Sequence, residues 1–334
     1  MKVVIPVAGL GSRLKPHTFV TSKALLPIAG KEVLSYVLDD VASLQPEEVI
    51  VIVGYHKEKI IEFVQKNYPS LPCTFKEQEV LDGDGGALRV ALEGTTDDEL
   101  YVIFGADTLI DFSLKKELQA LRKASVDAGV FTMQVADPSH YGVVNVDADG
   151  FVYELEEKPA LPKSNLAIIG AYYFSSSDRI KTILNTFYER EESLNGEYKI
   201  AQVLDYLTQT DKVKAVEVSQ WFDCGRVEVL LDANAYFLEK KSKHKVVKRG
   251  SSLIIPPCYV PQSVKLERSI VGPHVSLGED VSLTDVHISR SIIGVGSTLE
   301  SVQVKDSVCG KDVTLISAPR QVSLTDKSSL VSKR

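Results

Sequence analysis

Residues 3–13 read VVIPVAGLGSR, an apolar run that ends at two closely spaced glycines. Such a run is typical of a strand buried on both faces of a parallel sheet, and the glycines indicate a sharp turn at its carboxyl end. Further apolar runs then alternate with stretches of helical periodicity, at 32–44, 49–53, 57–67, 100–104, 114–124 and 129–135. This alternation predicts an α/β domain with a mostly parallel sheet, whose ligands bind at the carboxyl ends of its strands.

The pattern then changes to hairpins. Two strand-like segments, 142–146 and 151–155, flank a turn rich in Asp, so the predicted sheet is mixed. At 334 residues the chain is long enough for two domains of roughly 100–200 residues each. We expect a first domain at 1–242, a second domain at 250–318 and a polar tail at 319–334.

The second domain is predicted from a repeat. An aliphatic residue recurs at every sixth position, as in Val271, Leu277 and Leu283, and the phrase Ser-Ile-Val-Gly at 269–272 returns twice in related form. An aliphatic residue at each sixth position lines the inside of a triangular parallel β-helix. The repeat therefore favours about three irregular coils of a β-helix over an array of hairpins.

Charge, hydropathy and cysteine patterns exclude several classes of protein. The net charge of −7 disfavours a general binder of nucleic acid or of anionic membranes. No apolar run approaches roughly 18 residues and the N-terminus does not resemble a signal peptide, so we expect a cytoplasmic protein that does not associate with membranes. The four cysteines are widely spaced, which predicts reduced thiols rather than a zinc site or a disulfide framework.

The first 31 residues have an unusual charge pattern. They contain five basic residues and no Asp or Glu, although the whole chain is acidic. Arg13 follows the glycine turn directly, and Lys23 lies ten residues later. Leu14 stands where a dinucleotide fingerprint has its third glycine, and the chain has no GxxxxGKS/T motif. Two cations beside a glycine loop suit a triphosphate that loses pyrophosphate, and a tight turn with solvated basic residues is the alternative.

These residues give the sequence a resemblance to the sugar-1-phosphate nucleotidyltransferases, or NDP-sugar pyrophosphorylases, typified by glucose-1-phosphate thymidylyltransferase. Their signature is L/V-A-G-x-G-T/S-R-L-x-P-x-T followed by K-x-L-L/I-P-I/V, and this chain reads VAGLGSRLKPHT at 7–18 and KALLPI at 23–28. Further family motifs follow in order, at 78, 83–88, 105–107, 141–144, 157–159, 170–174 and 221–225. The resemblance implies a Rossmann-like nucleotidyltransferase domain with a mixed, mostly parallel sheet and, as in longer members, a short C-terminal left-handed parallel β-helix.

The resemblance also implies a reaction and a metal. A sugar-1-phosphate oxygen attacks the α-phosphate of an NTP with the assistance of Mg²⁺, and pyrophosphate leaves. By resemblance Arg13 steadies the leaving pyrophosphate, Lys23 holds the phosphates near the transferred group, and Asp107 is catalytic. Asp107 and Asp223 would bind Mg²⁺. Without the resemblance, an Asp that follows a strand is as readily a helix cap or a turn former.

The other implied site residues bind the two substrates. The nucleotide-binding residues are Ala8, Gly9, Leu10, Gly11, Ser12, Gln78 and Gly83. The residues that bind the sugar phosphate are Tyr141, Gly142, Glu157, Lys158 and Gly170. Glucose-1-phosphate with dTTP or UTP is the leading pair, and guanylyl transfer to mannose-1-phosphate is the runner-up. Base and sugar are left open because several residues depart from the commoner family pattern, namely Leu10, Ala24, Ala106 and Arg226.

Two other classes of function stay open at this stage. Hexapeptide β-helices often carry acyltransferase chemistry with a histidine base, and His274 and His287 lie in the predicted β-helix. A non-catalytic regulatory homologue built on the same fold is the other class. Apart from the substrates, the partner that we expect is a second copy of the chain, joined through the β-helix into a homo-oligomer.

Overall fold

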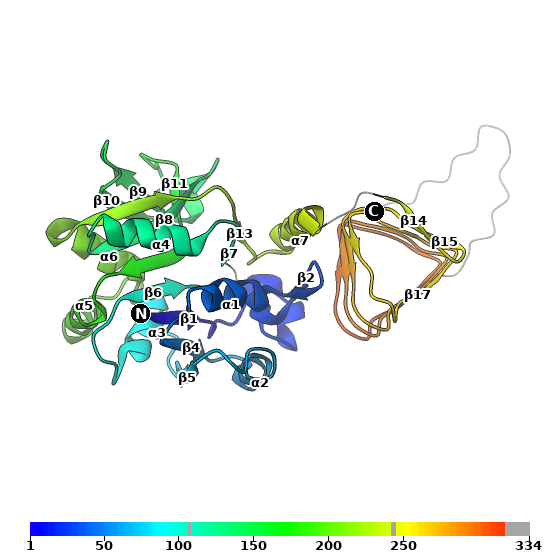
Figure 1. Ribbon diagram of the computed structural model, residues 1–334, viewed down its shortest axis with the longest axis horizontal. Helices are drawn as coiled ribbons and strands as arrows, with labels where there is room; N and C mark the ends of the chain where they lie inside the picture. The colour runs from blue at the N-terminus through cyan, green and yellow to red at the C-terminus, as the bar shows by residue number, and fades with distance from the viewer. Residues whose placement is uncertain (106–107, 242–244, 318–334) are drawn as a thin grey trace. The chain divides into compact units, whose positions relative to one another are not determined.

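The computed structural model describes residues 1–105, 108–241 and 245–317. The chain divides into two compact units, Met1–Ala233 and Asn234–Arg334 (Figure 1). The division falls within helix α7 (Val227–Lys241), and the domain limits at 242 and 250 stay predictions. None of the described helices is long and apolar enough to cross a membrane.

The first unit is built on a mixed sheet, which in the described part of the chain has nine strands. Its central strand β1 (Lys2–Pro6) is buried along its whole length and pairs in parallel with β4 (Glu48–Val53) and β6 (Leu100–Ile103). Strand β4 pairs in parallel with β5 (Cys73–Glu77). The remaining strands are β8 (Ala128–Gln134), β9 (Gly142–Val146), β10 (Val152–Glu157), β11 (Leu166–Phe174) and β12 (Val213–Glu217).

Strand β11 joins the parallel and antiparallel parts of this sheet. It pairs antiparallel with β6, β8 and β9, while β10 pairs antiparallel with β9 and β12 pairs in parallel with β8. The strand order is β10-β9-β11-β6-β1-β4-β5, and β8 and β12 continue from β11. The predicted α/β domain with a mixed sheet is therefore confirmed, and the hairpin at 142–155 is the pair β9 and β10.

Helices and short strands complete the unit. The helices are α1 (Val33–Ser43), α2 (Lys57–Asn67), α3 (Asp84–Leu92), α4 (Leu114–Lys123), α5 (Ser177–Glu189) and α6 (Ile200–Thr210). The short strands are β2 (Pro27–Ile28), β3 (Lys31–Glu32), β7 (Thr108–Ile110) and β13 (Trp221–Asp223). The pairs β2 with β3 and β7 with β13 each form a separate two-stranded sheet.

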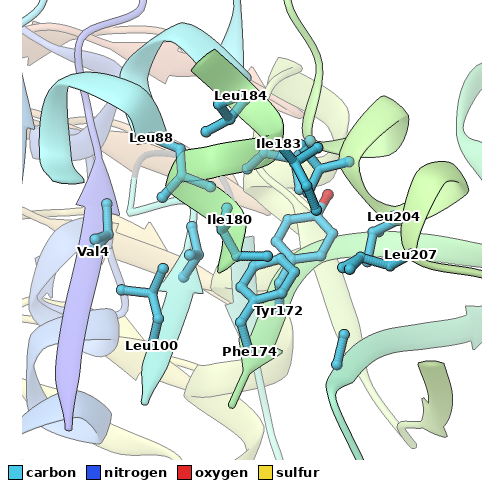
Figure 2. Packing of buried hydrophobic residues seen from close by; sticks show 14 of the residues in the cluster. Val4, Leu88, Leu100, Tyr172, Phe174, Ile180, Ile183, Leu184, Leu204 and Leu207 are labelled. Carbon is cyan, nitrogen blue, oxygen red and sulfur yellow. The ribbon is translucent and has the colours of Figure 1, made fainter. Parts of the chain in front are cut away.

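One hydrophobic core of the unit lies between the sheet and the helices α3, α5 and α6. Figure 2 shows the sheet side chains Val4, Leu100 and Tyr172 beside the helix side chains Leu88 and Ile180. On α5 the buried residues recur every three or four positions, which places them on one face of the helix. Burial of this apolar face accounts for the packing of α5 onto the sheet.

The second unit is a three-sided parallel β-helix, and Figure 1 shows its coils end-on as a triangle. In the described residues each side has four parallel strands, which makes four coils. One side is β15 (Ser252–Ile254), β18 (Ile270–Val271), β21 (His287–Ser289) and β24 (Gln303–Lys305), preceded by the antiparallel β14 (Val247–Arg249). The next side is β16 (Cys258–Tyr259), β19 (Val275–Leu277), β22 (Ser291–Ile293) and β25 (Val308–Cys309). The third is β17 (Lys265–Glu267), β20 (Ser282–Thr284), β23 (Thr298–Glu300) and β26 (Thr314–Ile316).

The predicted β-helix is confirmed, and the parallel sheets are consistent with the left-handed form. The aliphatic residues read from the repeat, among them Val271, Leu277 and Leu283, form its buried interior. The β-helix has four coils in the described residues, whereas about three were expected. The expectation was too low because the recurring Ser-Ile-Val-Gly motif does not fall on the same side of the β-helix each time. Ser269 precedes β18, whereas Ser291 starts β22 on the next side. In both places the serine oxygen accepts a backbone N–H from the following coil, at 3.0 and 3.2 Å, which explains the recurrence.

Two polar side chains form hydrogen bonds at the N-terminal end of this unit. The Arg249 guanidinium donates to the carbonyl oxygens of Pro261, Gln262 and Val264, at 3.1, 2.6 and 2.8 Å, and so closes the first coil. The Asn234 side chain of α7 is fully buried and accepts a hydrogen bond of 2.6 Å from the Ser276 hydroxyl. Because of its three bonds, Arg249 belongs to the first coil of the β-helix.

Candidate active site

A cavity of about 920 Å³ lies in the first unit, where the carboxyl ends of β1 and β6 meet the middle of β11. Pro6 ends β1, Phe104 follows β6, and both line the cavity. Strand β11 bends here, because its register shifts between Ile168 and Tyr172. Gly170 sits in that irregularity at φ 77°, where a Cβ would come within 2.7 Å of the Phe104 ring. Only glycine fits this bend, which opens the sheet beside the cavity.

The glycine turn after β1 forms one wall of the cavity. Gly11 adopts φ 63° and ψ 37° at the start of a short 3-10 helix, Ser12–Leu14. The Thr18 hydroxyl donates to the Gly11 carbonyl at 2.9 Å, and its methyl carbon would lie 2.9 Å from a Cβ at this position. Gly11 is thus held in a left-handed conformation, and Arg13, two residues later, lines the cavity.

Arg13 and Asp223 face each other across this wall. The shortest distance between the guanidinium and the carboxylate is 3.7 Å, and the Arg13 side chain is 52% exposed while Asp223 is 19% exposed. Asp223 ends β13, and its other oxygen accepts the Gly225 N–H at 3.2 Å. Because Asp223 is the more restrained partner, the ion pair holds Arg13 at the edge of the cavity. Lys23, in a short helix begun by Ser22, also lines the cavity.

A second cation and carboxylate also line the cavity. Glu157 ends β10, and its carboxylate is 3.5 Å from the ammonium of Lys158. Lys158 adopts a positive φ of 47°, and its N–H donates to the Tyr141 carbonyl at 3.1 Å. A Cβ on Gly142 would lie 3.0 Å from the Glu157 carboxylate, so the glycine leaves room for this close approach.

The cavity brings together almost all of the predicted site residues. Those that line it are Ala8, Gly9, Leu10, Gly11, Ser12, Arg13, Lys23, Gln78, Gly83, Tyr141, Gly142, Glu157, Lys158, Gly170 and Asp223. Asp107 lies outside the described residues, so its predicted catalytic and metal-binding roles stay predictions. Residues far apart in the sequence thus converge on one site.

Several lining residues were missed by sequence reasoning. Lys199 and Glu197 form an ion pair here, and the buried Asp84 carboxylate accepts the Ile200 N–H at 2.7 Å. Burial raises the pKa of Asp84. Burial opposes the charge of Lys199, but its bond to Glu197 and the charge of Asp84 raise the pKa of Lys199 overall. Asp84 lies in the motif at 83–88 but was not assigned to the site, and no motif covers Glu197 or Lys199. Their meeting depends on a contact between the start of α3 and the start of α6.

Trp221 and Arg226 are two further lining residues. The Trp221 ring meets the Tyr141 ring edge to face, with centroids 5.2 Å apart. Its indole N–H is buried and has no acceptor within the described part of the chain. Arg226 had been noted only as a departure from the family pattern. Together with Arg13, Lys23, Lys158 and Lys199 it makes the cavity rich in cations, as a polyanionic ligand requires.

Comparisons with known proteins agree with this geometry. A family profile described as nucleotidyl transferase matches residues 2–240. The chain is 34% identical over 262 residues to the bifunctional protein GlmU of Methanocaldococcus jannaschii, a match that covers 76% of this chain but only 60% of that relative. It is 27% identical over 341 residues to a glucose-1-phosphate thymidylyltransferase of Streptomyces griseus, with 96% and 94% of the two chains covered.

A solved structure shows the same fold. It is a Bacillus anthracis protein, assigned as a glucose-1-phosphate thymidylyltransferase and crystallised in complex with a sucrose. The TM-score is 0.63 at 26% sequence identity, and the match covers 71% of this chain and 94% of that chain.

Proposed function

We propose, because this chain belongs to the nucleotidyl transferase family, that it transfers a nucleotidyl group from an NTP to a sugar-1-phosphate and releases pyrophosphate. Glucose-1-phosphate with dTTP or UTP is the leading substrate pair. The observation that carries the proposal is a single cavity that combines a glycine turn, several cations and a set of carboxylates. The name of the Streptomyces griseus relative supports the sugar and one of the two bases.

The cations would act on the phosphates. Nucleotidyl transfer needs positioning and neutralisation of charge more than it needs a protein nucleophile. Arg13, beside the glycine turn, would hold the departing pyrophosphate, and Lys23 would hold the phosphates next to the transferred group. Lys158, which also lines the cavity, would bind the phosphate of the sugar and orient its attacking oxygen.

The carboxylates and the bend in β11 would bind the sugar. Sugar hydroxyls donate hydrogen bonds, and ionised carboxylates are strong acceptors for them. Glu157 would accept from the sugar, while Tyr141, Gly142 and Gly170 shape the space beside it. Because Glu157 is 3.5 Å from Lys158, one segment would bind both the sugar ring and its phosphate.

We further propose that Asp223 and Asp107 hold Mg²⁺. Asp223 pairs across the β7 and β13 ladder with Thr108, the residue that follows Asp107 in the sequence. In the described residues no group of three or more His, Cys, Asp or Glu could hold a metal. One or two carboxylates together with substrate phosphates are, however, a usual donor set for Mg²⁺. When bound there, the ion would neutralise charge on the phosphates during transfer.

The direct test is a panel of NTPs and sugar-1-phosphates incubated with the purified protein and Mg²⁺, with pyrophosphate as the readout. We expect release with dTTP or UTP and glucose-1-phosphate, and loss of release when Mg²⁺ is chelated. Release only with GTP and mannose-1-phosphate would select the runner-up. No release with any pair would reject the proposed function.

Variants separate the proposed roles. Arg13→Ala should lower kcat by about 100-fold or more, because it removes a charge that acts on the leaving group. Lys15→Ala is the matched control, since Lys15 is on the same turn but is not among the residues that line the cavity. Asp107→Ala should also lower kcat by about 100-fold or more. Wild-type turnover in Arg13→Ala or in Asp107→Ala would contradict the role given to that residue.

We also propose that the β-helix joins copies of the chain. Leu253 and Ile270 are partners on neighbouring strands, and they are 40% and 37% exposed. An apolar pair on the outer face of a sheet suits contact with a second copy. Light scattering of the full chain should show a species larger than the monomer, and Leu253→Lys together with Ile270→Lys should dissociate it. A monomeric wild-type protein would contradict this assignment.

A further inference from the structure

Gln78 follows β5, is 6% exposed and lines the cavity. Its amide nitrogen donates to the Gly83 carbonyl at 2.9 Å and to the Asp82 carboxylate at 3.2 Å. A primary amide has two N–H groups, so these two bonds use both of them. Within the described part of the chain no group donates to the carbonyl oxygen of Gln78.

The orientation of this amide follows from its partners. Both the Gly83 carbonyl and the Asp82 carboxylate are acceptors, and neither can bond to the amide oxygen. A flipped amide would set its oxygen against two other oxygens and leave its nitrogen without those bonds. Gln78 therefore offers a ligand a hydrogen-bond acceptor and no donor.

Asp82 is itself held in place by α5. Its second carboxylate oxygen accepts the Tyr188 hydroxyl, and burial and the charge of Asp82 raise the pKa of Tyr188, so the hydroxyl stays a donor. The Tyr188 ring stacks on Tyr198 with centroids 3.7 Å apart, and the Arg89 guanidinium lies 4.3 Å from its centroid. These contacts leave the tyrosine little freedom to release Asp82.

The backbone around Asp82 is equally restrained. The Tyr198 N–H donates to the Asp82 carbonyl at 2.7 Å, and the Gly85 N–H donates to the Tyr198 carbonyl at 2.9 Å. A Cβ at Gly86 would lie 1.9 Å from the Asp82 carboxylate, and a Cβ at Gly83, where φ is 109°, would lie 2.2 Å from the Tyr198 carbonyl. Glycines at 83 and 86 therefore let the carboxylate reach Gln78.

We propose that Asp82 and Tyr188 are positioning residues that fix Gln78 as an obligatory acceptor, so that the cavity selects NTPs whose base presents a ring N–H. The inference rests on the proposed function and deepens it by naming the class of base. Uracil and thymine present such an N–H at N3, and guanine presents one at N1. Cytosine and adenine present a bare nitrogen at the corresponding place, which would face the Gln78 oxygen with no proton between them.

The pair UTP and CTP isolates this effect, because the two nucleotides are alike in size, ribose and charge. A site built to hydrogen-bond one partner rejects the analogue that lacks the hydrogen by several orders of magnitude. We expect kcat/KM for at least one of UTP, dTTP and GTP to exceed that for CTP and for ATP by 100-fold or more. Turnover of CTP within tenfold of the best of these three would overturn the inference and leave the proposed function intact.

Two variants test the positioning role. Asp82→Ala removes one acceptor from the Gln78 amide and should reduce the ratio of kcat/KM for the preferred base over CTP at least tenfold. Tyr188→Phe keeps the stacked ring but removes the bond to Asp82, and should reduce the same ratio at least threefold. In both variants the KM for sugar-1-phosphate should stay unchanged. Tyr206→Phe, an exposed tyrosine on α6 outside this chain of contacts, is the matched control.

Equilibrium binding separates failure of this inference from failure of the proposed function. Calorimetry with UTP, dTTP, GTP, CTP and ATP, without a sugar-1-phosphate, reports recognition of the base whether or not turnover occurs. Preferential binding of the three bases with a ring N–H supports the inference even if no pyrophosphate is released. Equal binding of all five nucleotides, or an unchanged ratio in a folded Tyr188→Phe variant, refutes it.

Discussion

Gly225→Ala should impair catalysis through Arg13 while leaving the fold intact. A Cβ on residue 225 would lie 2.6 Å from a terminal guanidinium nitrogen of Arg13 and 2.9 Å from the Asp223 carboxylate. Gly225 has no positive φ, so alanine can adopt its backbone conformation. The substitution therefore acts on the two side chains and not on the turn itself.

The size of the effect follows from these distances. An ordinary contact of 3.4 Å requires the Arg13 guanidinium to move by about 0.8 Å. Because the Arg13 side chain is 52% exposed, it can move into solvent at little cost to the free energy of unfolding. A displacement of this size in a group that positions a reacting phosphate is expected to lower kcat/KM by roughly 10–100-fold, or about 1.4–2.7 kcal/mol of transition-state stabilisation.

Pyrophosphate release under saturating sugar-1-phosphate measures the loss, and thermal unfolding measures stability. Gly310→Ala is the matched control, because a Cβ there meets no atom within 4 Å, and it should behave as the wild type in both assays. If Gly225→Ala retains wild-type kcat/KM while Arg13→Ala loses activity, the position of the guanidinium is not critical and the reasoning fails.

Two further predictions concern stability. Burial raises the pKa of Asp40 from 3.8 to about 6, so its charge opposes folding at neutral pH. This penalty shrinks as the pH falls through about 6 and is lost below the ordinary pKa of 3.8. Asp40→Asn should raise the free energy of unfolding at pH 7 by about 1–3 kcal/mol but should have little effect at pH 4, as measured by urea denaturation. Arg249→Met removes three bonds to carbonyls of the first coil and should cost about 1–3 kcal/mol with faster hydrogen exchange in that coil. The exposed Arg268→Met is its control and should lower the free energy of unfolding less than Arg249→Met does.

The fold of the first unit can be predicted from the sequence because it depends on local patterns of apolar residues and glycines. A buried parallel strand needs a continuous apolar run, and the chain has one at residues 3–7, of which 3–6 belong to β1. A glycine turn follows, and the Thr18 hydroxyl bonds to it. The site residues in this turn and beside Glu157 are recognisable in the sequence because the backbone there requires glycine at fixed positions. Gly11 and Gly142 each lie where a Cβ would press on a neighbouring side chain.

What the sequence could not give depends on contacts between distant segments. Lys199 and Asp84 line the cavity because the start of α6 bonds to the start of α3. Neither segment has a sequence pattern that predicts its contact with the other. The number of coils was misjudged for a related reason. Partner residues in successive coils are 16 or 17 positions apart, as Leu283 is from Leu299 and from Leu266. One coil is therefore shorter than three sides of six residues each. A phrase that recurs after 22 residues has therefore moved to another side.

Under the proposed function, the distribution of charge in the cavity bears on how an acidic chain would bind a triphosphate. Two cations of the site are paired with carboxylates. Arg13 lies 3.7 Å from Asp223, and Lys158 lies 3.5 Å from Glu157. Both pairs are loose and partly exposed, so each contributes little to stability, and a phosphate can replace the carboxylate at small cost. A chain with a net charge of −7 would thus keep the cations that we propose for phosphate binding oriented before the substrate arrives. Binding would then exchange one partner of Arg13 for another, which ties the position of Asp223 to the position of the pyrophosphate.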